Sequence, residues 1–138
     1  MTSVLVVHHD TAIADVETDS LRAAGYVVEQ CIGPIEGGGP CPVMRGDLCP
    51  AVAHADVLMY DVWMHGDADR GREMVARLLR DYAGTPIVLT SPGLAPDWPE
   101  LDAPGVAVLE GRPTRVSLVA AIEAAVGSLA DAALAAAR

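Results

Sequence analysis

Residues 4–10 read VLVVHHD, an apolar run that ends in two histidines and an aspartate. A continuous run of mostly β-branched residues is typical of a strand that is covered on both faces in a parallel sheet. In open parallel sheets, functional groups gather at the carboxyl ends of the strands. The stretch therefore predicts a buried first strand that delivers His8, His9 and Asp10 to a functional edge.

Four further apolar segments predict the remaining strands, at residues 26–31, 56–62, 86–91 and 105–109. Helical patterns follow at residues 67–82 and 114–137, and a first helix is expected between a cap at Asp10 or Thr11 and an end at Gly25. We expect the buried stripe of that first helix to consist of Ile13, Val16, Leu21 and Ala24. Strands that alternate with helices predict a parallel α/β sheet in one domain over residues 1–138.

Two connections depart from this alternation. Residues 32–54 hold four prolines and five glycines, and residues 92–104 hold four more prolines. Such segments do not sustain regular helices, and long irregular loops in compact domains are often functional. We therefore expect an irregular, cysteine-containing insertion in place of the second helix, and a shortened fourth helix that leaves Trp98 exposed.

The charge balance limits the classes of partner. The chain has nine arginines and no lysine, with a net charge of −10 at pH 7. A nucleic-acid partner is excluded on this ground, because binding of phosphates relies on clustered Lys and Arg. No uncharged apolar run reaches the ~20 residues of a membrane helix, and the N-terminus has no signal-peptide pattern. We expect a cytoplasmic bacterial protein without a membrane partner, whose thiols are reduced.

The order of the strand ends resembles the receiver domain of response regulators, the CheY-like family of two-component signal transduction. The segments that carry the resemblance are VLVVHHD (4–10), VLMYDVWM (57–64), PIVLTSPG (86–93) and VAVLEGRPT (106–114), and together they extend over essentially the whole chain. The resemblance implies a flavodoxin-like, doubly wound (βα)5 fold with five parallel strands.

The resemblance also implies roles for individual residues. Asp61 stands at the position of the phospho-accepting aspartate, and Thr90 stands at the switch hydroxyl that follows the phosphoryl group. Arg112 takes the place of the family's lysine, which keeps the positive charge but not the compact geometry of an ammonium group.

The first strand departs from the family. His8 and His9 replace the acidic pair that holds magnesium, and Asp10 remains as a displaced acid. Mg²⁺ prefers oxygen ligands, and without it the charge on a transferring phosphoryl group loses its main stabiliser. We therefore expect an atypical pseudo-receiver with no catalytic activity, no bound magnesium and no other cofactor. The alternative is a working phospho-acceptor at Asp61.

Three cysteines support a different hypothesis. Cys31, Cys41 and Cys49 all lie in or beside the long Pro/Gly-rich connection. Three thiolates and an imidazole would suit Zn²⁺ or another transition metal, and three thiols could also form one disulfide and act as a redox sensor. The plainest interpretation is that they are small buried hydrophobes.

The segment at 114–137 completes the prediction. Its apolar residues Leu118, Ile122, Val126 and Leu129 recur on one face of the predicted helix. We expect this face to cover the sheet. Its last turns could extend beyond the sheet and form a dimer contact. We expect a stand-alone signalling domain that acts by binding another protein or a second copy of itself.

Overall fold

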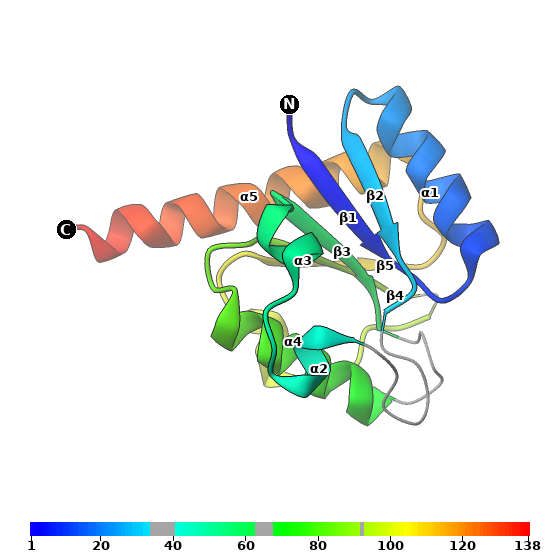
Figure 1. The fold of residues 1–138 in the computed structure, drawn as a ribbon. Coiled ribbons are helices and arrows are strands. Elements are labelled where there is room, and N and C mark those ends of the chain that lie inside the picture. The colour runs from blue at the N-terminus through cyan, green and yellow to red at the C-terminus, as the bar shows by residue number, and fades with distance from the viewer. Residues whose placement is uncertain (34–40, 63–67, 92) are drawn as a thin grey trace.

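Five parallel strands form the centre of the protein, in the order β2-β1-β3-β4-β5 (Figure 1). The computed structural model describes residues 1–33, 41–62, 68–91 and 93–138, without the side chains of 68–70. The strands are β1 (Ser3–Val7), β2 (Val27–Cys31), β3 (Val57–Asp61), β4 (Ile87–Ser91) and β5 (Val106–Glu110). Every predicted strand is confirmed to within about one residue, and so is the doubly wound flavodoxin-like topology.

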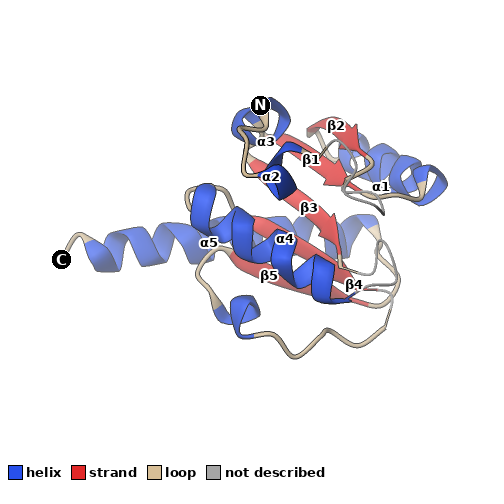
Figure 2. Ribbon diagram, turned by 60° about the horizontal axis from the view of Figure 1, so that its bottom comes forward, coloured by secondary structure: helices blue, strands red, loops and turns tan. Residues whose placement is uncertain are grey.

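Helices cover both faces of the sheet (Figure 2). On one face lie α1 (Thr11–Ala23) and α5 (Arg115–Ala136), which pack on the alternate strand residues that include Val4, Val6, Met59 and Val88. The other face carries α2 (Pro42–Arg45), α3 (Pro50–His54), α4 (Ala68–Asp81) and a 3₁₀ turn, η1 (Pro99–Asp102). Because side chains on a strand alternate between faces, the buried residues of β1 and β3 serve both layers.

The described part of the first irregular connection is more ordered than expected. Within 32–54 the described part contains two short helices, α2 and α3, and each begins at a proline that follows a cysteine. The expected shortening of the fourth helix is confirmed, since the described residues 93–104 contain a single 3₁₀ turn, η1. The exposure predicted for Trp98 is wrong, because its ring packs against the buried cluster and lies 3.3 Å from the position that a Cβ on Gly71 would take.

The rotation of α1 differs from the prediction. Asp10 caps the helix, with Oδ1 accepting from the N–H groups of Ala12 and Ile13. Leu21 is buried as expected, but the other buried residues are Ala14, Glu17 and Thr18. The apolar side chains of Ile13 and Val16 are instead 44% and 65% exposed. The predicted stripe is therefore wrong by about one position around the helix axis.

The long helix α5 has two parts. Leu118, Ile122 and Ala125 pack it against the sheet, with Ala125 in the buried position that had been expected for Val126. The remaining turns extend past the sheet to the C-terminus (Figure 1). Although acidic residues interrupt its apolar run, α5 is long and apolar enough to cross a membrane by length and composition, with 22 residues and a mean hydropathy of 1.7. Core helices of soluble proteins meet the same criterion.

Candidate functional site

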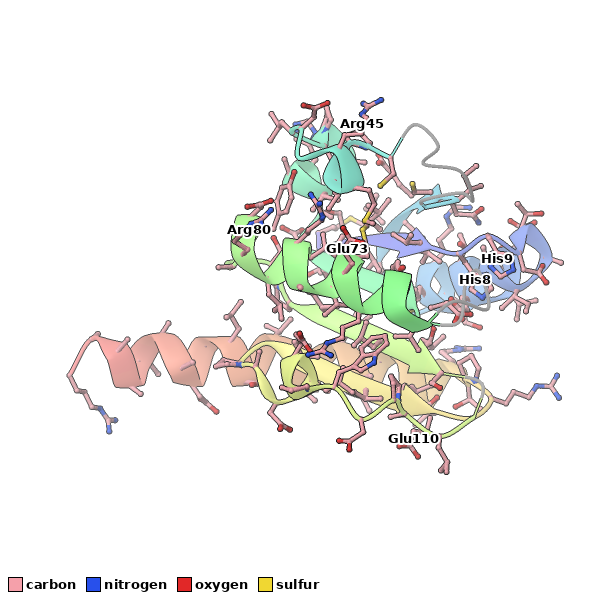
Figure 3. All side chains as sticks on the ribbon, turned by 90° about the horizontal axis from the view of Figure 1, so that it is seen from below. His8, His9, Arg45, Glu73, Arg80 and Glu110 are labelled. Atoms are coloured by element: carbon pink, nitrogen blue, oxygen red, sulfur yellow. The ribbon has the colours of Figure 1, made fainter. Side chains whose placement is uncertain are left out.

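The carboxyl ends of the strands surround a cavity of about 470 Å³. Its polar lining includes His8, Asp61, Thr90 and Arg112, so the structure brings together four of the residues predicted for the site. Helix α1 supplies the opposite wall through Ala12, Ile13, Val16 and Glu17. Figure 3 shows His8 and His9 at the end of the sheet that lies away from the free end of α5.

His8 and Asp61 form the central contact of the cavity. The His8 Nε2 atom lies 2.7 Å from Asp61 Oδ2, and the two side chains are 3% and 13% exposed. The other ring nitrogen, Nδ1, accepts a hydrogen bond from the backbone N–H of Asp10 at 3.0 Å. Because Nδ1 acts as an acceptor, the ring proton is assigned to Nε2, which donates it to Asp61.

The charge state of His8 depends on opposing effects. Burial lowers the pKa of its imidazole, whereas the hydrogen bond to Asp61 and the negative charges of Asp61, Glu17 and Asp10 raise it, and the net direction is upward. The N–H of Asp10 opposes this rise, because it occupies the Nδ1 lone pair that a second proton would need. A second proton on His8 would therefore disturb the start of α1.

His9 and Asp10 do not line the cavity. His9 is exposed and its ring stacks on that of His8, with centroids 5.5 Å apart and planes at 18°. Asp10 serves as the N-cap of α1. Of the three residues expected to form the degenerate acidic pocket, only His8 contributes a side chain to it, because the chain leaves the sheet directly after that residue.

Glu17 is the site residue that the sequence analysis missed. Its side chain is 3% exposed, and its Oε2 has no hydrogen-bond partner among the described residues. Burial raises the pKa of this carboxyl to about 7, with His8 lowering it and Asp61 raising it. The spacing of Ala14, Glu17, Thr18 and Leu21 (i, i+3, i+4, i+7) was the available signal, but the competing stripe with Ile13 and Val16 is more apolar.

The three cysteines line a second and smaller cavity, of about 120 Å³, next to Leu5, Val7 and Met74 on the α4 side of the sheet. All three are free thiols, and Cys31 Sγ accepts from the N–H of Gly33 at 3.3 Å. Burial raises the pKa of the Cys31 thiol. The structure thus brings the cysteines together, but on a different cavity from His8.

The residues present do not fit the magnesium ion that the receiver resemblance implies. A buried imidazole already contacts Asp61 Oδ2, where a hard cation would require carboxylate or water oxygens. Within the ranges that the structure describes, no three His, Cys, Asp or Glu side chains are placed to share a metal ion.

Of the comparisons with known proteins, the one with solved structures identifies the fold. No protein-family model and no curated protein sequence matches the chain. Among solved structures, the N-terminal domain of a response regulator/sensory box/GGDEF three-domain protein from Carboxydothermus hydrogenoformans is 18% identical with a TM-score of 0.67, over 96% of this chain and 99% of that one. A CheY-like receiver domain protein from Methanospirillum hungatei gives 18% and 0.67, over 95% and 98% of the two chains.

The chemotaxis protein CheY4 from Vibrio cholerae is 24% identical with a TM-score of 0.63, and the match covers 89% of this chain and 97% of that one. Identities at this level establish the fold alone, because receiver-like folds carry many different sites. The chain therefore has the fold of a CheY-like response-regulator receiver domain, with a histidine in contact with the aspartate that ends its third strand.

Proposed function

We propose that the protein is an atypical receiver-like signalling domain that acts through protein–protein contacts and does not use magnesium-dependent aspartyl phosphorylation. The contact between His8 Nε2 and Asp61 Oδ2 at 2.7 Å carries this proposal. A phosphoryl donor would have to displace a buried imidazole from the oxygen that attacks. The transfer would also proceed without the metal ion that neutralises the negative charge on the moving phosphoryl group.

The interaction surface is proposed to include the part of α5 that extends beyond the sheet. Leu134, on the turns beyond the buried part of the helix, is apolar and 63% exposed, and Val126, next to the buried Ala125, is 43% exposed. Exposed apolar side chains on a protruding helix are suited to a contact with another protein or a second copy. We also propose a cytoplasmic location for this domain.

The first prediction concerns phosphorylation. After incubation with acetyl phosphate and Mg²⁺, the intact mass of the wild-type protein is expected to remain unchanged. The variant His8→Asp/His9→Asp, which has carboxylates at the two positions where the receiver resemblance implies an acidic pair, serves as the comparison. A stoichiometric gain of one phosphoryl group by the wild type, which is absent from Asp61→Asn, would show that Asp61 is a working phospho-acceptor.

The cysteines support a second candidate function, a thiol redox sensor. All three line the same cavity, so limited movement of the loop could bring two sulfurs together. Against it, the raised pKa of Cys31 keeps this thiol protonated and therefore weakly nucleophilic at neutral pH.

Counting thiols and metals separates the two functions. The signalling proposal predicts three reactive thiols per chain in denaturant, and no stoichiometric metal, for protein purified without a reductant. One thiol per chain would favour a disulfide-based sensor. Stoichiometric zinc in the wild type that is absent from Cys41→Ser would favour a metal site.

A further inference from the structure

Helix α1 buries a carboxyl side chain and exposes two large aliphatic ones, which lowers the stability of the fold. Its buried face includes Glu17, which is 3% exposed, while Ile13 and Val16 are 44% and 65% exposed. Burying a carboxyl without a hydrogen-bond partner costs free energy, and so does leaving large aliphatic side chains in water. A local arrangement that conflicts with stability is expected mainly at functional sites.

All of these unfavourable features belong to the same cavity. Glu17, Ile13 and Val16 line the cavity of about 470 Å³, together with Pro113 from the loop after β5. The volume lies within the roughly 300–1,000 Å³ that is typical of small-molecule sites, which combine apolar walls with a few polar groups. Glu17 lines this cavity, and its buried Oε2 has no hydrogen-bond donor among the described residues.

The charges around this acceptor favour a cation. Asp61 lies in the same cavity, and its Oδ2 contacts His8 Nε2 at 2.7 Å. Arg112 lines the rim but forms no ion pair with Glu17 in the part of the chain that the structure describes. An anionic ligand would place its charge beside two carboxyl groups, whereas an ammonium group would supply both the donor and the charge that they need.

We propose that this cavity binds a small organic cation, with a primary ammonium group donating to Glu17 and an apolar body lying against Ile13, Val16 and Pro113. The ligand would satisfy the buried carboxyl and cover the two exposed aliphatic side chains in one step. This binding site does not depend on whether Asp61 accepts a phosphoryl group. Failure of the proposed binding site would therefore leave the proposed signalling function unaffected, and the reverse also holds.

The test uses four probes in titrations of the isotopically labelled protein followed by NMR. 2-Phenylethylamine carries both the cation and the apolar body, 2-phenylethanol lacks the charge, 3-phenylpropionate reverses it, and methylamine lacks the body. We expect saturable shifts at cavity residues with 2-phenylethylamine, and affinity weaker by about tenfold or more for each of the others, which is the usual effect of losing one charge-assisted contact or one buried apolar group.

Two variants separate the contributions to binding. Glu17→Gln keeps the size of the side chain but removes its charge, and it should weaken 2-phenylethylamine by about tenfold. Glu29→Gln makes the same change at an exposed position on β2 and should leave the affinity unchanged. Val16→Thr, which keeps the shape but replaces one methyl group with a hydroxyl, should weaken the binding of 2-phenylethylamine without affecting that of methylamine.

Either of two selectivity results would overturn the proposal. One is that 2-phenylethanol or 3-phenylpropionate binds as tightly as the amine, which would mean that charge does not select the ligand. The other is that Glu17→Gln and Glu29→Gln bind 2-phenylethylamine equally well, which would place the amine elsewhere. Absence of saturable shifts with all four probes would also reject a cation site of this size.

Discussion

Glu17→Gln is expected to make the protein more stable than the wild type at about pH 8, by up to about 3 kcal/mol, and to change its stability little near pH 5. The wild-type carboxyl is buried and has a pKa of about 7, against an ordinary value of 4.5. The difference of about 2.5 pKa units, at about 1.4 kcal/mol for each unit, sets the size of the effect.

The sign of this effect follows from proton uptake. Because the folded protein holds the Glu17 proton to a higher pH than the unfolded chain does, folding is coupled to proton binding between about pH 4.5 and 7. The stability of the wild type therefore falls as the pH rises through this window, and the full penalty is present above it. A glutamine cannot ionise and removes this penalty, although its amide is also buried without a partner and carries a cost that does not depend on pH.

Chemical denaturation at several pH values between about 5 and 8 measures the effect, and the diagnostic quantity is the change in the free-energy difference between Glu17→Gln and wild type. Glu29→Gln provides the control, because Glu29 is exposed and its replacement should give a nearly constant difference. A difference for Glu17→Gln that is equally independent of pH would show that Glu17 ionises normally in the folded protein.

His8→Ala is expected to destabilise the protein by about 3 kcal/mol. The imidazole is 3% exposed and contacts Asp61 at 2.7 Å through Nε2. Its removal leaves a cavity, a carboxylate without its histidine partner and an Asp10 N–H without the acceptor that it has in the wild type. Partial exposure of Asp61, at 13%, allows water to compensate in part, which keeps the cost below that of a fully buried pair.

The loss should be larger at low pH. The pKa of His8 is raised in the folded state, so its interaction with Asp61 contributes most below the ordinary pKa of 6.5 and is lost as the pH rises through the folded-state pKa. His9→Ala is the matched control: His9 is exposed and stacks on His8, and its replacement should cost less than about 1 kcal/mol. Equal effects of the two alanine variants would contradict the central role given to His8.

Local patterns along the chain were sufficient to predict the sheet and the edge at which the candidate site residues meet. Runs such as VLVV and IVLT are apolar at every position, which only strands buried on both faces require. Parallel strands share one carboxyl edge, so His8, Asp61 and Thr90 had to meet once the strands were assigned. The resemblance to receivers added Arg112 to the same edge, and the structure places it on the rim of the cavity.

What the sequence did not reveal was the rotation of helices about their axes. In α1 two neighbouring stripes compete, one with Ile13 and Val16 and one with Ala14 and Glu17. Hydrophobicity favours the first stripe. The Asp10 cap and the packing of Ala14 and Leu21 on the sheet select the second. The same ambiguity applies to α5, in which Ala125 is buried although Val126 was expected to be.

The sequence by itself therefore determined which residues lie at the carboxyl ends of the strands. Each strand has a local apolar pattern, and parallel strands share one carboxyl edge. Only the tertiary structure decided that Glu17 enters the cavity and that the cysteines line a separate one on the other face. The physical reason is that consecutive side chains on a helix point about 100° apart around its axis, so an error of one position changes which side chain is buried. That choice depends on caps and on contacts with distant strands, which no single segment encodes.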